Sequence, residues 1–238
     1  MSFDQFDLPI LRFLAAFSGK SDAFDRLILA ISSYAIFEGV FMMSLLWFSW
    51  FHGRAEETDD ERRKRRARLL IVLAGSIVIV AFSRVLQFVL NIHQRPILSD
   101  IGLTFPAFID RSFLNPWNSF PSDHAMLFFA FATGLWGIKR SLGMIAYLWQ
   151  GIVIDLPRVY LGIHYPSDVV AGWVLGILCM LAFEKLPLGR PALRLVAWGD
   201  AHQASFYAFA FLLTDQLALL FDDLRRIAAG VVRNLHRM

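Results

Sequence analysis

Cysteine and charge are both scarce in this sequence of 238 residues. Its single cysteine, Cys179, excludes an intrachain disulfide framework and a cysteine-based metal site. Charged residues make up 18% of the chain, whereas about a quarter is typical of soluble globular domains. Hydrophobic residues make up 57%, and they gather in long runs. This composition predicts a protein that crosses a membrane several times.

Three further features are missing from the sequence. The first ten residues contain two aspartates and no lysine or arginine, so a cleaved signal peptide is not expected. No internal repeat and no low-complexity linker interrupts the chain. We therefore expect residues 1–238 to form one domain.

The apolar runs predict an all-α fold, a polytopic bundle of transmembrane helices. Five spans are expected, at residues 24–50, 69–92, 122–138, 142–156 and 166–183. The third and fourth are shorter than the roughly 20 residues that cross a bilayer, which is tolerated where their ends line a polar cavity. Residues 8–17 are too few to span and include Arg12, so they predict an interfacial helix.

The C-terminal segment allows two interpretations. Residues 205–221 are apolar enough for a sixth span, but Asp215 would lie near its centre, where a charge costs about 2.5 to 3.5 kcal/mol. Over residues 205–238, apolar positions recur at helical spacing, and arginines occupy the other face. This pattern favours an amphipathic helix on the anionic membrane surface.

Basic residues set the expected orientation. The stretch "ERRKRRARLL" at residues 61–70 lies between the first two predicted spans and predicts a short cytoplasmic loop. A nucleic-acid patch is the alternative interpretation of such a run, but its position beside a span argues against a nucleic-acid partner. The N-terminus is then outside the membrane, in the periplasm if the membrane is a bacterial inner membrane.

On this threading, three distant segments reach the outer face. They are "RP" after the second span, "PSDH" at the start of the third, and "RVYLGIHYPSD" between the fourth and fifth. They carry two histidines, two arginines and an aspartate, namely Arg95, His124, Arg158, His164 and Asp168. We therefore expect these five side chains to meet on one side of the bundle.

This set of side chains suits phosphoryl transfer. Two arginines can clamp a phosphate, and the first turn of the helix after Ser122 offers free N–H groups to an anion. Ser122 itself can cap that turn or donate to a phosphate oxygen. Asp168 lies one helical turn from His164 and can accept its Nδ1–H, leaving Nε2 as a nucleophile. His124 can then protonate the leaving oxygen. Taken alone, His164 and Asp168 would be better explained as a hydrogen-bonded helix start; Arg95, His124 and Arg158 on the same face favour catalysis.

The three segments resemble, in order and spacing, the signature motifs of the type 2 phosphatidic acid phosphatase superfamily. The resemblance covers residues 69–183, and "PSDH" and "GIHYPSD" are similar to bacterial undecaprenyl-diphosphate phosphatases within it. It implies that His164 forms a phosphohistidine, Asp168 orients it and His124 is the general acid. Arg95 and Arg158 become phosphate ligands. The family needs no metal, and no cofactor is expected.

Two positions depart from the family pattern. Phe88 occupies the place of the first motif's lysine, and we expect Arg84, one turn earlier on the same face, to replace it. Pro157 replaces the serine that usually precedes the third motif's arginine. Both changes affect groups that contact phosphate, and neither affects the two histidines or Asp168.

Three further polar residues lie in or near the motifs. Asp123 lies among the candidate substrate-binding residues, but a carboxylate repels phosphate. Asp123 is therefore expected to interact favourably with the N-terminus of its helix or to orient a neighbouring side chain. Glu38, inside the first predicted span, is either a buried partner for an arginine or a functional carboxylate. His93 is expected to be interfacial.

The sequence thus predicts a membrane enzyme that hydrolyses a lipid phosphate or diphosphate, possible substrates being undecaprenyl diphosphate, phosphatidate and phosphatidylglycerophosphate. Transfer of the phosphate to another lipid would use the same residues. A non-catalytic lipid-phosphate binder is the alternative from another class, and the missing lysine is its best argument. The soluble haloperoxidases with related motifs do not fit so apolar a chain. The oligomeric state stays open.

Overall fold

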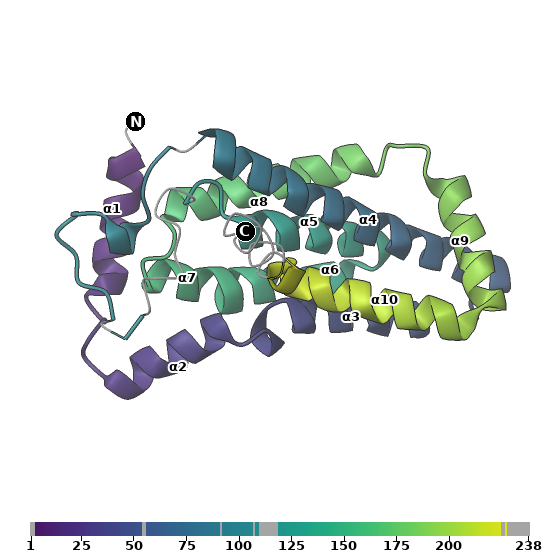
Figure 1. Ribbon diagram of the computed structural model, residues 1–238, viewed down its shortest axis with the longest axis horizontal. Helices are drawn as coiled ribbons and strands as arrows, with labels where there is room; N and C mark the ends of the chain where they lie inside the picture. Colours follow the sequence, from purple (N-terminus) through teal and green to yellow (C-terminus); the bar gives the residue numbers. More distant parts are fainter. Residues whose placement is uncertain are drawn as a thin grey trace, which may run out of the picture.

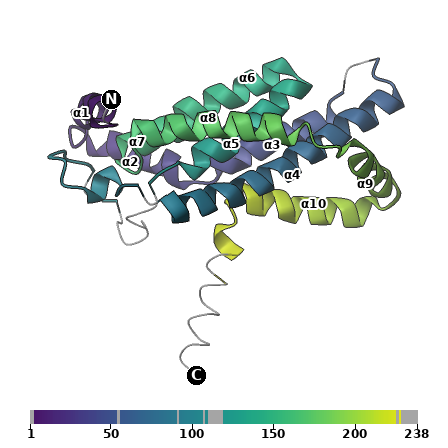
Figure 2. The ribbon, with the colours of Figure 1, turned by 90° about the horizontal axis from the view of Figure 1, so that it is seen from above.

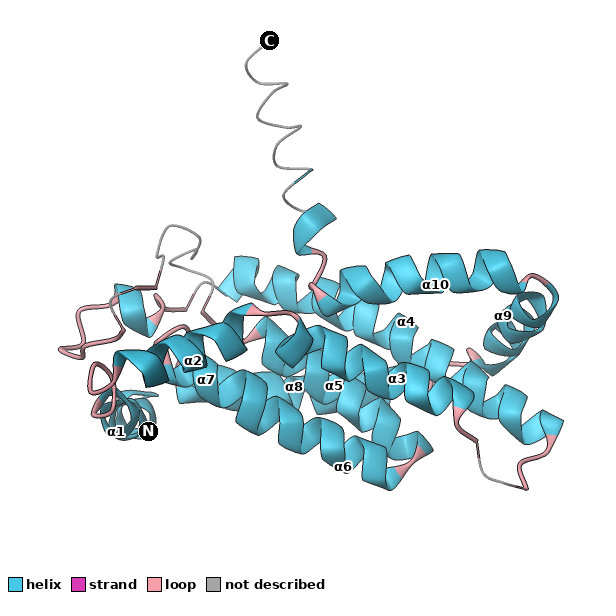
Figure 3. Cartoon of the chain, turned by 90° about the horizontal axis from the view of Figure 1, so that it is seen from below, coloured by secondary structure: helices cyan, strands magenta, loops and turns pink. Residues whose placement is uncertain are grey.

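The described part of the chain consists of helices and loops. A computed structural model describes residues 3–53, 56–90, 92–106, 108–109, 119–224 and 227, and no strand occurs among them (Figure 3). The helices are α1 (Phe3–Ala15), α2 (Asp22–Ser33), the π-helix η1 (Ile36–Val40), α3 (Phe41–Phe51), α4 (Asp59–Leu90), the 3-10 helix η2 (Pro96–Leu98), α5 (Asp123–Ile138), α6 (Arg140–Trp149), the π-helix η4 (Gln150–Asp155), α7 (Leu156–Tyr160), α8 (Pro166–Phe183), α9 (Gly189–Ala201) and α10 (Gln203–Ala218). The predicted all-α fold is confirmed over these residues.

Helix α5 lies at the centre of the molecule. It packs against α4, α6 and α8, and its side chains from Ala125 to Phe128 and from Ala130 to Leu135 are buried. Figure 1 shows these long helices side by side, with α1 across one end and α9 across the other. Figure 2 shows α6 and α8 on one side of the bundle and α10 on the opposite side.

A close approach of α8 to α5 depends on glycine. A Cβ atom on Gly176 would lie 2.3 Å from the carbonyl oxygen of Met126, and one on Gly172 would lie 2.8 Å from that of Ser122. Any larger residue at either position would push the two backbones apart. The N-terminal ends of α5 and α8 are therefore held together, and both begin at predicted motif residues.

The structure supports fewer spans than the five expected. In the described chain, α4 and α8 are long and apolar enough to cross a membrane, and the bent pair formed by α2 and residues 36–51 makes up to three. The helix α5 has 16 residues and reaches about 24 Å at 1.5 Å per residue, less than the roughly 30 Å of a hydrocarbon core. The fourth predicted span lies within a continuous helical stretch made up of α6, η4 and α7, which is α-helical at both ends and π-helical between them.

The first predicted span and the basic loop also differ from expectation. The chain bends by 64° between α2 and the helix that follows, so residues 24–50 do not form one straight helix. The basic run was expected to be a loop, but α4 begins at Asp59 and includes it. Ion pairs explain the helix, since Arg62 and Lys64 pair with aspartates one turn earlier, at 2.5 Å and 2.6 Å.

The C-terminal prediction needs correction. The helix expected over 205–238 ends at Ala218, because Leu220 and Phe221 adopt left-handed backbone angles. Helix α10 packs one face against α3, where Trp50 Nε1–H donates to the Tyr207 hydroxyl at 3.0 Å, and its other face is exposed. The expected arginine face begins at Arg225 and Arg226, and Arg233 and Arg237 follow; all four lie outside the described residues.

Candidate active site

The three predicted motif segments converge at one end of the bundle. Arg95 follows α4, Ser122 and His124 stand at the start of α5, and Arg158 to Asp168 join α7 to α8. An Arg95 terminal nitrogen lies 3.3 Å from His164 Nε2, which links the first and third segments directly. The backbone N–H of Ser122 donates to the Asp168 carbonyl at 3.1 Å, which links the second and third.

Hydrogen bonds fix the loops that carry these residues. Ser122 is fully buried and caps α5 by accepting from the Ala125 N–H, which is one of the two roles expected of it. The buried Gln87 side chain of α4 donates to the Pro121 carbonyl at 2.9 Å. At the start of α8, Asp7 of α1 accepts from both the backbone N–H and the hydroxyl of Ser167. Residues outside the motifs thus hold both helix starts.

His164 is 1% exposed, and a different group from the one expected holds its ring. Its Nδ1 lies 2.9 Å from the Ser119 carbonyl oxygen and 3.7 Å from Asp168 Oδ2. A carbonyl only accepts, so Nδ1 carries the proton and Nε2 keeps a lone pair. Burial lowers the pKa of His164 to about 4, so the ring is neutral at pH 7. The geometry therefore provides the unprotonated Nε2 that was expected, here facing Arg95, through Ser119 in place of a direct bond to Asp168.

Asp168 holds the surroundings of His164 together. Its carboxylate accepts from the Ser119 hydroxyl at 2.6 Å and from the Tyr165 N–H at 2.9 Å, and it lies 3.2 Å from His93 Nε2. Ser119 therefore connects Asp168 to His164, with its hydroxyl on one and its carbonyl on the other. The sequence argument missed this indirect link.

His93 is part of this network and not simply an interfacial residue. Burial lowers the pKa of His93, but the hydrogen bond and the charge of Asp168 more than offset that effect, so the pKa is raised. Its position two residues before Arg95 was the only signal in the sequence. Contact with Asp168 depends on how residues 92–95 leave α4, which no spacing predicts.

The second histidine is bracketed by carboxylates. Asp123 Oδ1 lies 2.9 Å from His124 Nδ1, and Glu38 Oε2 lies 3.6 Å from His124 Nε2. Asp123 also pairs with Arg84 at 2.7 Å, and Glu38 pairs with Arg158 at 2.5 Å. Asp123 therefore orients His124, one of the roles expected of it, while Glu38 is a buried partner for an arginine.

Arg84 and Phe88 point to different surroundings although they are one turn apart on α4. Phe88 is 85% exposed, whereas Arg84 reaches the buried Asp123. A lysine at position 88 would be attached to the exposed face of α4, away from the motif residues. The structure thus directs Arg84 toward the motif residues, but through Asp123 and not as an isolated cation.

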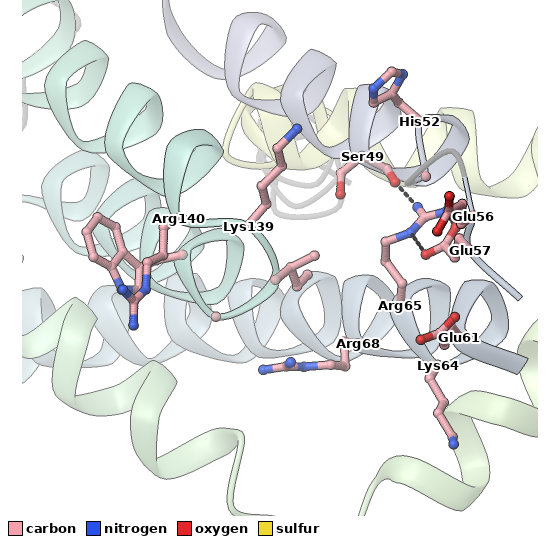
Figure 4. Close-up of a pocket in the computed structure, with 14 residues that line it drawn as sticks. Ser49, His52, Glu56, Glu57, Glu61, Lys64, Arg65, Arg68, Lys139 and Arg140 are labelled. Atoms are coloured by element: carbon pink, nitrogen blue, oxygen red, sulfur yellow. Dashed lines mark hydrogen bonds and ion pairs between the residues drawn. The ribbon is translucent and has the colours of Figure 1, made fainter.

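The cavity of about 980 Å³ in Figure 4 lies at the other end of α5. It is lined by the end of α3, the start of α4 and the turn between α5 and α6. Arg65 crosses its wall to pair with Glu57 at 2.7 Å. None of the candidate site residues borders this cavity. Over the described residues, no three His, Cys, Asp or Glu side chains are arranged to hold a metal ion.

Comparison with known proteins places the motif segment in a family. Residues 90–190 match the model of the PAP2 superfamily. The superfamily predicted from the three motifs is therefore confirmed over this segment, which holds every candidate site residue except Arg84.

Two curated relatives match shorter stretches. The "Bacitracin transport permease protein BcrC" of Bacillus licheniformis is 39% identical over 64 residues, which cover 27% of this chain and 31% of that protein. The "Undecaprenyl-diphosphatase" of Sulfolobus acidocaldarius is 36% identical over 58 residues, covering 24% of this chain and 28% of that protein. The matches thus span less than a third of either relative's length.

The crystal structure of LpxE from Aquifex aeolicus superposes with a TM-score of 0.50, covering 76% of this chain and 96% of that one. Its sequence is 21% identical, so the likeness concerns the fold alone. It extends well beyond residues 90–190 and indicates that the helices around the motif segment also share an arrangement with that protein.

Proposed function

We propose that this protein hydrolyses a lipid phosphate or diphosphate through a phosphohistidine on His164. The observation that carries the proposal is the state of that ring. His164 is buried and neutral, with Nδ1–H held by the Ser119 carbonyl and Nε2 directed at Arg95. A nucleophilic nitrogen beside a fixed guanidinium is the arrangement that attack on a phosphorus atom requires.

The reaction proceeds in two balanced steps. Nε2 of His164 attacks phosphorus, the bond from phosphorus to the leaving oxygen breaks, and His124 gives that oxygen a proton. A water molecule then attacks phosphorus and loses a proton to His124, and the phosphorus–nitrogen bond breaks. Arg95 and Arg158 stabilise the charge on the phosphoryl oxygens in both steps, together with first-turn N–H groups of α5.

Two features favour an enzyme over a lipid-phosphate binder. A binder needs cations, but it has no use for a second histidine that a carboxylate orients at 2.9 Å. The absence of the motif lysine is also a weaker argument for a binder, since Arg84 on α4 reaches Asp123 of the second motif. Transfer of the phosphoryl group to an alcohol in place of water remains the second candidate, because the first step is identical.

We propose undecaprenyl diphosphate as the first substrate to test, because the Sulfolobus acidocaldarius relative is named an undecaprenyl-diphosphatase. Phosphatidate and phosphatidylglycerophosphate are the alternatives. In the proposed reaction His124 transfers the protons, and arginines and backbone N–H groups stabilise the negative charge. We therefore expect the purified protein to release phosphate with EDTA present, and fastest from the diphosphate. Release that EDTA abolishes and Mg²⁺ restores would contradict the proposal.

We further propose a multi-pass protein of a bacterial-type inner membrane with the site on the periplasmic face. The basic start of α4 and the His164 cluster lie at opposite ends of the bundle, and basic segments stay cytoplasmic. In a Cys179→Ser background, a cysteine at Gly102 is expected to react with an impermeant maleimide on intact spheroplasts. A cysteine at Glu61 is expected to react only after lysis, and the reverse pattern would invert the topology.

A further inference from the structure

Glu38 stands out among the buried residues because it comes from a segment far from the motifs. It lies on η1, outside residues 90–190, and is 9% exposed. Its carboxylate lies between two motif residues, 2.5 Å from an Arg158 nitrogen and 3.6 Å from His124 Nε2. No motif of the resemblance includes a carboxylate at this place.

The backbone around Glu38 is built to turn this side chain inward. Its φ and ψ of −100° and −112° leave the helical region within the π-helix, at the bend between α2 and α3. The end of α10 packs directly on the next residue, because a Cβ atom on Gly39 would lie 2.1 Å from the Ala218 carbonyl oxygen. The bend and α10 thus fix a carboxylate that would be costly to bury without a partner.

The surroundings of His124 explain what this carboxylate can do. Asp123 accepts from Nδ1 at 2.9 Å, and Arg84 holds Asp123 from the other side. The other ring nitrogen, Nε2, faces Glu38, and the Phe128 ring meets the imidazole edge to face. Glu38 at 3.6 Å is too far from Nε2 for a direct hydrogen bond, but a carboxylate beside each ring nitrogen favours the form of the imidazole in which both nitrogens carry protons. Only that form can give a proton to a leaving oxygen while keeping its bond to Asp123.

We propose that Glu38 is a positioning residue for the general acid, keeping a proton on His124 Nε2 until the leaving oxygen takes it. The proposal rests on the proposed function, since it assigns a role within the same reaction. Glu38 also occupies Arg158 in the substrate-free protein. The substrate phosphate must therefore compete with Glu38 for Arg158, and removal of the Glu38 charge should not weaken phosphate binding.

The leaving group provides the test. Phosphatidate loses a poorly stabilised alkoxide and needs a proton donor, whereas p-nitrophenyl phosphate loses a stable phenolate and needs one much less. We expect Glu38→Gln to lower kcat for phosphatidate by about 10²-fold, the usual contribution of a general acid, with KM unchanged or lower. Its kcat for p-nitrophenyl phosphate should stay close to that of the wild type. Glu38→Asp should recover part of the phosphatidate activity.

Glu57→Gln is the matched control. Glu57 is also little exposed and paired with an arginine, Arg65, but at the far end of the bundle, so this variant should match the wild type on both substrates. Equal losses by Glu38→Gln on both substrates, or a raised KM, would overturn the proposal in favour of a structural or phosphate-binding role. If the wild type released phosphate from undecaprenyl diphosphate but from neither of these two substrates, the proposed function would stand and this test would be repeated on the diphosphate; if it released phosphate from none of the three, the proposed function would fail, and this inference with it.

Discussion

Replacing His164 with alanine is expected to lower phosphate release by about 10³-fold or more, since the loss of a nucleophile removes the covalent route entirely. The reason lies in the ring's surroundings. His164 is neutral at pH 7 because burial lowers its pKa to about 4, and its Nδ1–H is fixed on the Ser119 carbonyl. No other described imidazole nitrogen both keeps a lone pair and faces Arg95. Water would have to attack phosphorus directly in the variant.

The experiment compares His164→Ala and His164→Gln with His202→Ala on undecaprenyl diphosphate and phosphatidate. His202 is exposed and stacks on Trp198 at the other end of the molecule, so its replacement should leave the rate unchanged. Melting temperatures of all three variants separate a lost nucleophile from a lost fold. Release by both His164 variants at rates near that of the wild type would remove His164 from the reaction.

Replacing Arg84 with alanine is expected to lower kcat by about 10²-fold, because Arg84 supports the general acid through Asp123. Asp123 is 6% exposed and accepts from His124 Nδ1 while Arg84 neutralises it. Without that cation, the buried carboxylate is left uncompensated and favours its protonated form. A protonated Asp123 orients the imidazole less strongly and stabilises its positive charge less.

Phe88→Ala is the control from the same helix. Phe88 stands at the family's lysine position but is 85% exposed, so we expect its removal to leave kcat unchanged. Arg84→Lys should recover part of the activity by restoring the charge. If Arg84→Ala matched the wild type, Arg84 would not be the substitute for the missing lysine. If Phe88→Ala were the damaging variant, the outer face of α4 would take part in binding the substrate.

Sequence reasoning placed the motif residues well because it needed only the order and the direction of the apolar runs. Runs that alternate in direction bring Arg95, His124 and His164 to one end, whatever the details of packing. The partners of these residues were harder to predict. Ser119 and His93 reach Asp168 through the paths of loops, and side-chain spacing along a helix says nothing about such paths.

Two predictions about the fold were wrong because the pattern of apolar residues along the chain carries limited information. Mean hydropathy over residues 24–50 cannot register the bend between Ser33 and Ile36, because an average over many residues contains no information on backbone angles. The charge of Asp215 favoured a surface helix, yet the hydroxyls of Thr214 and Tyr207 on α10 accept hydrogen bonds from the indole N–H groups of two tryptophans on α3. Packing between helices determines both the bend in residues 24–50 and the position of α10. The periodicity of one helix carries no information about that packing.

The central claim is a phosphoryl group carried by His164, and its direct test is to trap that group. The wild type is mixed with substrate, quenched in alkali within milliseconds, and digested for mass spectrometry, because phosphohistidine survives alkali but not acid. We predict a phosphoryl group on the peptide containing His164, lost on acid treatment and absent from His164→Ala. A phosphoryl group on any other residue, or rapid phosphate release with none on the protein, would contradict the account.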